Sequence, residues 1–166
     1  MFGEFTPTNL ETELEMIDTN VRAVHILTKL FVKDMVQQDK GYILNVGSIA
    51  SFMPGPLMAT YYASKSYVLR MTQAVQEELK KKKSKVHVCI LCPGPVNTNF
   101  NQVAKVRFHL KGASSEEIAR YAINRMLKKK KIVVPQVKIK MARLLSKIAP
   151  DGIVGKVCYH MQEKKK

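Results

Sequence analysis

Residues 41–65 read GYILNVGSIASFMPGPLMATYYASK, and this stretch decides the fold. The run YILNV at residues 42–46 is apolar, rich in branched side chains and flanked by glycines, as expected of a buried strand. Residues 48–56 contain two prolines and a glycine, which predict a loop. A helix is expected to begin near Thr60 and to end in the lysine run at residues 80–83.

The neighbouring segments repeat this alternation of helix and strand. From Thr8 to near Gly41 apolar residues recur at spacings of three and four, which predicts one long helix. Residues 86–91 are a second apolar, branched run, closed by Cys92 and a proline-glycine turn, and they predict a second buried strand. Two such alternations predict an α/β fold in which helices cover a parallel sheet.

The last third of the chain has weaker signals. Ser114 is expected to cap a helix that has two glutamates in its first turn, and residues 132–134 are expected to form a short strand. Residues 137–148 are amphipathic and basic, and Asp151 is expected to cap a final helix. We therefore expect a single domain over residues 1–166, of which residues 136–166 form a basic amphipathic helical tail.

The chain has 166 residues and a formal charge of +15, which raises the question of a nucleic-acid partner. The charge is uneven: residues 1–78 carry 6 Lys or Arg and 9 Asp or Glu, whereas residues 79–166 carry 22 and 4. Much of the excess forms lysine clusters at expected helix ends, where they complement the helix dipole and remain solvated. No recognition motif or aromatic platform accompanies them, so no nucleic-acid partner is expected.

The composition also bears on the cellular compartment. Hydrophobic residues make up 46% and charged residues 25%, as in folded proteins. No apolar run approaches the roughly 20 residues that span a bilayer, and no leader pattern is found. The three cysteines do not form a disulfide framework. These features favour a cytoplasmic protein.

Three residues form the pattern with the most chemical content. Tyr61 and Lys65 are four positions apart on the expected helix, so their side chains lie on one face. A tyrosine hydroxyl with a pKa near 10 is a poor acid or base at neutral pH unless its phenolate is favoured, and a nearby ammonium does this. Ser48, after the strand that faces this helix, is placed to hydrogen-bond a carbonyl or an alcohol oxygen. The three residues suit proton transfer to or from an alcohol.

In this context the chain resembles the short-chain dehydrogenase/reductase superfamily. Residues 43–48, ILNVGS, are similar to the family's strand that ends in Asn and Ser, and residues 61–66, YYASKS, are similar to its active-site helix. Residues 86–98, with PGPVNT at the end, are similar to its next strand and loop, and Asn20 stands where the family keeps a fourth catalytic residue. The resemblance implies a Rossmann-like, doubly wound parallel sheet.

The resemblance also implies a role for each of these residues. Tyr61 would be the general acid or base on the substrate oxygen. Lys65 would lower the pKa of Tyr61 and bind the nicotinamide ribose. Ser48 would orient and polarise the carbonyl. Asn20 would hold a water that links Lys65 to solvent.

The implied cofactor is NAD or NADP, and the sequence does not indicate which. Besides Tyr61 and Lys65, the resemblance implies cofactor contacts from the loop after the second strand, through Pro93, Gly94, Val96 and Thr98. The implied substrate is a small-molecule carbonyl or alcohol compound, whose identity residues 99–112 and the tail would determine. The family's packing implies a homo-oligomer formed through the two long helices.

One part of the family pattern is missing from the sequence. None of the eight glycines forms a G-x-G-x-x-G turn after a strand, where the family binds the pyrophosphate. The chain is therefore expected to be the carboxy-terminal, catalytic portion of such a domain, truncated on its amino-terminal side and marginally stable alone. The alternative function is a catalytically inactive remnant that acts as an interaction or membrane-surface protein. Two kinds of role are open for the basic tail. It could contact an anionic membrane or a partner helix, or it could cover the substrate pocket or form part of a dimer interface.

Other candidate residues are expected to be structural. Cys89 and Cys92 have redox spacing, but on a strand they point to opposite faces and are expected to be buried. The four histidines show no metal-ligand spacing, so no metal site is expected. Tyr62 points about 100° away from Tyr61 on the helix and is not expected to be catalytic.

Overall fold

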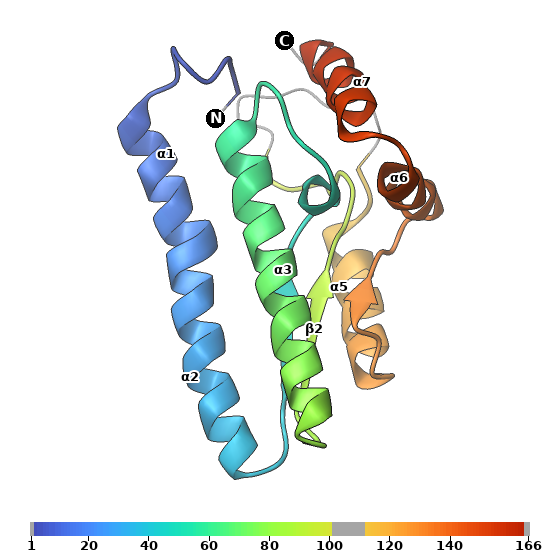
Figure 1. The fold of residues 1–166 in the computed structure, drawn as a ribbon. Coiled ribbons are helices and arrows are strands. Elements are labelled where there is room, and N and C mark those ends of the chain that lie inside the picture. Colours follow the sequence, from blue (N-terminus) through green and yellow to red (C-terminus); the bar gives the residue numbers. More distant parts are fainter. Residues whose placement is uncertain (1, 101–111, 165–166) are drawn as a thin grey trace.

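A computed structural model describes residues 2–100 and 112–164. It is an α/β structure in which long helices lie beside a small sheet (Figure 1). In chain order the elements are α1 (Leu10–Ile17), the π-helix η1 (Asp18–Ala23), α2 (Val24–Gln37), β1 (Tyr42–Val46), the 3-10 helix η2 (Ile49–Phe52), α3 (Ala59–Lys81), β2 (His87–Leu91), α5 (Ser115–Leu127), β3 (Ile132–Val133), α6 (Val137–Ile148) and α7 (Asp151–Glu163).

The sheet is parallel, with the order β1-β2-β3. Tyr42 pairs with His87 at one end of the β1–β2 ladder and Val46 pairs with Leu91 at the other, while Ile90 pairs with Ile132 on β3. The predicted parallel α/β fold is confirmed. Within the described residues β1 pairs on one side only, and Val46 is 54% exposed there.

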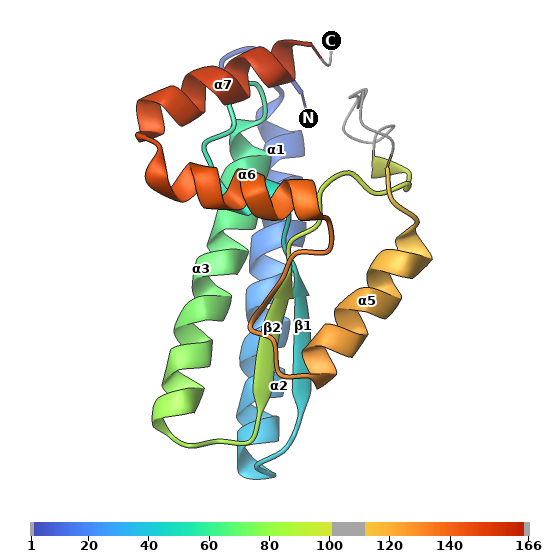
Figure 2. The same ribbon diagram turned by 90° about the vertical axis from the view of Figure 1, so that its right-hand side faces the viewer.

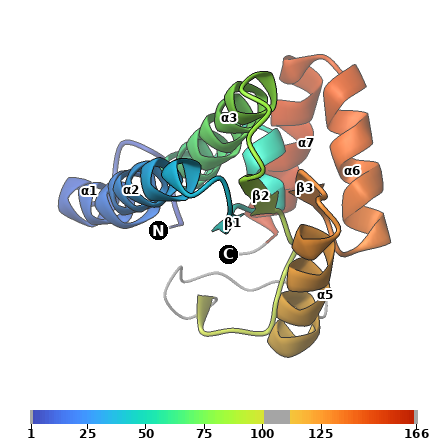
Figure 3. The ribbon, with the colours of Figure 1, turned by 90° about the horizontal axis from the view of Figure 1, so that it is seen from below.

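Helices cover both faces of the sheet because successive strand residues point to opposite sides. On one face α2 and α3 pack over Val86 and Val88. On the other face α5 packs over Leu91 and Val133 (Figure 3). This two-sided cover explains why the strands are apolar runs rather than alternating ones.

Buried polar side chains tie the helices to the strands. Asn45 on β1 accepts a hydrogen bond from Thr28 of α2 at 3.2 Å and donates one to Thr72 of α3 at 2.9 Å. Gln76 of α3 donates to the backbone carbonyls of Val88 and Lys131, each at 2.9 Å. Burial without these partners would cost free energy, so the bonds fix the position of α3.

The amino-terminal helix differs from the predicted one in two ways. It begins at Leu10 rather than Thr8, because Asn9 is the N-cap and its side chain accepts a bond from the Thr12 amide at 2.9 Å. It also contains a π segment, Asp18–Ala23, which the continuous apolar spacing did not reveal. Such segments insert an extra residue into the helical turn and often lie at functional sites.

Other boundaries differ by one residue. β2 begins at His87 rather than at residue 86, and β3 ends at Val133 rather than at residue 134. The N-cap of α7 is Pro150, so the prediction that Asp151 is the cap was wrong, and Asp151 is the first helical residue. The Ser114 cap is confirmed, since its hydroxyl accepts a bond from the Glu117 amide at 3.5 Å.

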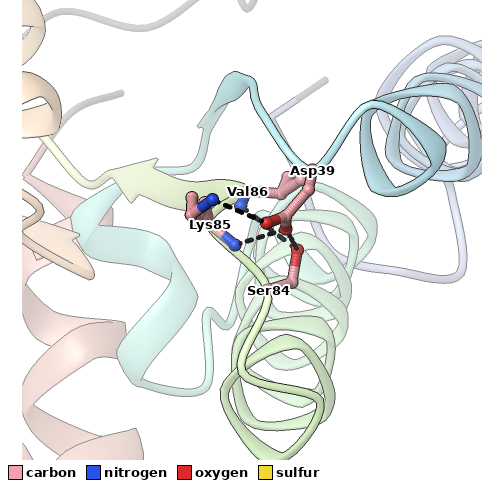
Figure 4. A network of polar contacts seen from close by, with 4 residues as sticks. All are labelled: Asp39, Ser84, Lys85 and Val86. Atoms are coloured by element: carbon pink, nitrogen blue, oxygen red, sulfur yellow. Dashed lines mark hydrogen bonds and ion pairs between the residues drawn. The ribbon is translucent and has the colours of Figure 1, made fainter.

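Where β1 and β2 begin, a polar network joins two turns (Figure 4). The Asp39 carboxylate accepts bonds from the Lys85 amide at 2.8 Å and the Ser84 hydroxyl at 3.1 Å, and the Lys85 ammonium lies 3.3 Å away. The Val86 amide donates to Ser84 at 3.2 Å. The Lys85 amide bond, followed by the other polar contacts, lowers the pKa of Asp39.

Residues 2–100 and 112–164 contain neither a membrane-spanning helix nor a cluster of metal ligands. No helix there combines the length and apolar character needed to cross a membrane. No group of three or more His, Cys, Asp or Glu side chains there is arranged to hold a metal ion.

Candidate active site

The carboxyl ends of β1 and β2 meet the start of α3, and the predicted site residues gather there. Ser48 follows β1 after Gly47, while Tyr61 and Lys65 lie in the first two turns of α3. Ser48 lies close enough to Tyr61 to lower the pKa of the Tyr61 hydroxyl. Residues from two segments thus meet at one point, the edge where parallel strands place ligand sites.

Ser48 is held by a capping box at the start of η2. Its hydroxyl accepts a bond from the Ala50 amide at 3.2 Å, and the Ser51 hydroxyl accepts one from the Ser48 amide, also at 3.2 Å. Because the Ser48 oxygen already accepts from the backbone, its own proton remains available to donate. The local fold therefore orients Ser48 as a donor.

Tyr61 lies in an aromatic environment. Its ring centroid is 5.2 Å from that of Phe100 and 6.1 Å from that of Tyr62, and all three rings pack against buried Met58. Burial raises the pKa of Tyr61 above its ordinary value of 10, and the hydrogen bond with Ser48 opposes this rise. The hydroxyl is thus protonated at neutral pH.

Lys65 lies near Tyr61 and is fixed by the backbone. Its Nζ donates to the carbonyl of Val46 at 3.2 Å and is 5.9 Å from the Tyr61 ring centroid. Burial lowers the pKa of Lys65. Burial is the largest influence on the pKa of Tyr61 in this structure, and Ser48 opposes it. That Lys65 lowers the pKa of Tyr61 stays a prediction.

Asn20 lies in the π segment that faces α3. Its Nδ2 donates to the Ser64 hydroxyl at 3.2 Å, and Ser64 donates to the Tyr61 carbonyl at 2.7 Å. Ser64 is buried and immediately precedes Lys65. The structure thus brings Asn20 to the helix that carries Tyr61 and Lys65, and Ser64 is its bonding partner there.

The loop after β2 is held from both sides. The Pro93 carbonyl accepts a bond from the Ile49 amide at 2.9 Å, next to Ser48. The Gly94 amide donates to Gln136 Oε1 at 2.9 Å, and Gln136 Nε2 donates to the Pro95 carbonyl at 3.3 Å. Sequence reasoning missed Gln136, although its position just after β3 is the signal that could have revealed it, since parallel strands end at one edge.

The end of this loop runs beside residue 113. Val96 and Ala113 form a parallel bridge, and the Asn97 amide donates to the Ala113 carbonyl at 2.9 Å. The Thr98 hydroxyl accepts a bond from the Phe100 amide at 3.3 Å. Of residues 99–112, expected to determine the substrate, residues 101–111 lie outside the described part of the chain.

The tail packs over this loop through α6. A Cβ atom on Gly94 would lie 2.8 Å from the end of the Ile139 side chain, so a larger residue here would displace Ile139. The Arg143 guanidinium lies 4.9 Å from the Phe52 ring centroid and near Cys92, while its Nε atom is buried without a hydrogen-bond partner. The tail is thus part of the wall of the site.

Tyr62, Cys89 and Cys92, which were expected to be structural, are held by packing and hydrogen bonds within the fold. The Tyr62 hydroxyl accepts a hydrogen bond from Gln162 of α7, and its ring lies against Gly55. Cys89 and Cys92 are free and buried, as predicted, and burial raises the pKa of their thiols to about 11 and about 12.

Comparisons with known proteins agree with this geometry. A family model for short chain dehydrogenases matches residues 1–107, more than half of the chain. The chain belongs to the short-chain dehydrogenase family. A very-long-chain 3-oxoacyl-CoA reductase of Mycosarcoma maydis is 35% identical over 101 residues, which cover 61% of this chain and 28% of that protein. The chain spans about a third of the length of the curated relatives it matches.

Two solved short-chain dehydrogenase structures share the fold. The Sphingobium yanoikuyae enzyme in complex with NADPH superimposes with a TM-score of 0.77 at 23% identity, covering 92% of this chain and 60% of that one. The Burkholderia phymatum enzyme in complex with NAD gives a TM-score of 0.77 at 18% identity, covering 87% and 60%. These structures confirm the Rossmann-like fold class expected from the sequence.

Proposed function

We propose that the chain carries the proton-transfer site of an NAD(P)-dependent oxidoreductase that interconverts a carbonyl and an alcohol. The observation that supports this most directly is that Ser48 and Tyr61 lie together at the carboxyl ends of the strands, with Lys65 one turn further along α3. In the reducing direction a nicotinamide held by Lys65 and the loop after β2 would supply the hydride for the carbonyl carbon. Tyr61 gives its proton to the carbonyl oxygen, which completes the alcohol.

The surroundings of Tyr61 suit a general acid. Since burial keeps the hydroxyl protonated, a proton is available in the reducing direction at neutral pH. Ser48 donates to the same substrate oxygen and stabilises the negative charge that develops there. In the reverse direction Tyr61 accepts the alcohol proton, and the nearby Lys65 ammonium favours the phenolate as substrate excludes water.

After Tyr61 has given its proton to the substrate, it must receive another proton from solvent. We propose that Lys65 and the Asn20–Ser64 contact form part of it, because Asn20 reaches α3 at the residue next to Lys65. An ammonium has three donors, of which the Val46 carbonyl takes one, so the remaining donors suit ribose hydroxyls. Water held by Asn20 would connect this group to solvent.

The residues present fit the nicotinamide end of the cofactor. Lys65 and Tyr61 supply hydroxyl-binding groups, while Pro93, Gly94, Val96 and Thr98 form a loop at the same strand edge. The supporting observation is the chemistry of this donor set. Two solved structures that share the fold are described as complexes with NADPH and with NAD. The printed sequence contains no Gly-rich turn for the pyrophosphate, so the fit concerns this end alone.

The test is ketone reduction with NADPH and with NADH by the chain and two tyrosine variants. Tyr61→Phe should lower turnover by about 10²–10⁴-fold, because the proton donor is removed. Tyr62→Phe, which removes the neighbouring hydroxyl, should stay within about threefold of the unaltered chain. Equal turnover for Tyr61→Phe and the unaltered chain would exclude the proposed role of Tyr61.

A second candidate function is a non-catalytic interaction protein, favoured by the missing Gly-rich turn and by the side of β1 that pairs with no strand among residues 2–100 and 112–164. Titration of the chain with NADH and NADPH, followed by nicotinamide fluorescence, separates the two functions. Binding in the micromolar range supports the oxidoreductase. No binding up to millimolar cofactor supports the interaction protein.

We also propose that the chain forms a homo-oligomer through its two long helices. The helix formed by α1, η1 and α2 exposes a series of large apolar side chains, which a second copy would bury. They include Leu10, Leu14, Ile17, Leu27, Leu30 and Phe31. Sedimentation velocity should detect a dimer that is weakened by Leu27→Ser with Leu30→Ser, and an unchanged monomer would exclude it.

A further inference from the structure

Helix α6 has an inner face that packs on the protein. Ile139 packs against the core cluster around Val68 and Ile90, and Arg143 stacks on Phe52. Ile139, Arg143 and their inner-face neighbours are partly buried, whereas the other residues of α6 are exposed. The orientation of the helix is therefore fixed.

The opposite face of α6 is apolar and open. At about 100° per residue, its side chains fall within an arc of about 100° that is centred opposite Ile139. Each is at least 60% exposed, although all are large and apolar; they are Val137, Met141, Leu144, Leu145 and Ile148. Isolated exposed leucines are ordinary, but a continuous stripe of five on a fixed helix indicates a surface that is covered in use.

Lysines border this stripe. Lys138 lies on one side of it, and Lys140 and Lys147 lie on the other, all exposed. No acidic residue occurs between residues 137 and 148. Helix α7 follows on the same side of the molecule (Figure 2) and exposes a shorter apolar row at Ile153, Val157 and Met161.

We propose that the outer face of α6 docks on an anionic membrane surface, with the helix lying in the plane of the interface. The apolar stripe would enter the boundary between headgroups and acyl chains, where interfacial helices bind. The lysine stems would lie along the apolar layer while their ammonium groups contact anionic lipid headgroups. A second copy would instead bring the same positive charges together, so charge complementarity favours the membrane. This proposal does not depend on catalysis.

The test is co-sedimentation of the full chain with vesicles of phosphatidylcholine containing phosphatidylglycerol, compared with vesicles of phosphatidylcholine alone. Binding should be stronger to the anionic vesicles and should decrease as salt is raised. Leu144→Ser with Leu145→Ser should weaken it by about tenfold or more. The matched control, Ile123→Ser with Leu127→Ser on α5, also changes exposed apolar residues and should leave binding unchanged.

A second pair of variants tests the charge. Lys140→Gln with Lys147→Gln should weaken binding to anionic vesicles, whereas Lys128→Gln with Lys130→Gln removes equal charge elsewhere and should have a smaller effect. Absence of binding to anionic vesicles would overturn the proposal, as would equal loss in test and control variants. Loss of self-association, without vesicle binding, in Leu144→Ser with Leu145→Ser would assign the face to a second copy instead.

Discussion

The two ends of strands β1 and β2 both carry polar side chains, but in different environments. At the amino ends, Asp39 and Lys85 form an exposed ion pair, with their side chains 47% and 79% accessible (Figure 4). At the carboxyl ends, Tyr61 and Lys65 are held in less accessible surroundings. Hydrogen bonds favour the charged form of Asp39, whereas burial disfavours the charged forms of Tyr61 and Lys65.

The amino ends of the strands therefore carry a structural contact, whereas the carboxyl ends carry the candidate active site. Exposed ion pairs contribute little to stability, and an ordinary turn can hold them. Groups whose charged forms are disfavoured by burial, and which lie at a strand edge, are more typical of catalytic positions. The comparison predicts that equivalent substitutions at the two ends affect different properties.

The largest expected effect is that of Lys65→Met. It removes the ammonium beside Tyr61 while keeping a side chain of similar length, so kcat/KM for ketone reduction should fall by at least about 100-fold. Lys85→Met makes the same change at the opposite end and should remain within about twofold. Steady-state kinetics of both variants measure the difference, and similar losses would remove the distinction between the two ends.

Cys89, in the middle of β2, gives a prediction about alkaline pH. Burial raises its pKa in the folded state from 9.0 to about 11. A raised folded pKa contributes stability that is present below pH 9 and is lost as pH rises through about 11. The free energy of unfolding from urea titrations should therefore fall over this window, by up to about 3 kcal/mol more than in Cys89→Ala. Parallel curves for the two proteins would show that the thiol does not titrate as proposed.

Gln136 tests the loop at the carboxyl ends. Gln136→Ala removes both bonds to the Pro93–Pro95 backbone, so the loop loses its fixed position. We expect about tenfold weaker NADPH binding by nicotinamide fluorescence, which corresponds to about 1.4 kcal/mol. Gln37→Ala, an exposed change at the end of α2, should bind as the unaltered chain does. A change in thermal stability alone, with unaltered affinity, would assign Gln136 a purely structural role.

Features that depend on residues close together in the sequence could be predicted. Strands β1 and β2 were predicted because two-sided burial makes apolar runs, and the proximity of Ser48, Tyr61 and Lys65 was predicted from their spacing together with the family resemblance. The contact from Gln136 to Gly94 spans 42 positions and depends on how the chain folds back after β3, so residue spacing did not specify it. Only the place of Gln136 just after β3 indicated that it lies at the same edge of the sheet. The π segment at Asp18–Ala23 preserves the apolar spacing and was missed for that reason. The direction of the pKa shift of Tyr61 depends on the burial of its side chain, which the spacing of residues in the sequence does not reveal.

The smallest expected effect is at the amino ends, with Asp39→Asn. The folded pKa of Asp39 is lowered, so its contribution to stability is present above the ordinary value of 3.8 and is lost as pH falls through the folded pKa. The Lys85 amide and Ser84 bonds can still be accepted by the Asn carbonyl, so only the charge is removed. The melting temperature at pH 7 should therefore be slightly lower in Asp39→Asn than in the unaltered chain. This difference should be smaller in high salt and should vanish in acid.

NADPH affinity should not change in Asp39→Asn, because the Asp39–Lys85 pair is at the opposite end of the strands from Lys65. A measurable loss of affinity in Asp39→Asn would mean that the two ends are coupled through β1 and β2, and the functional division between them would have to be abandoned.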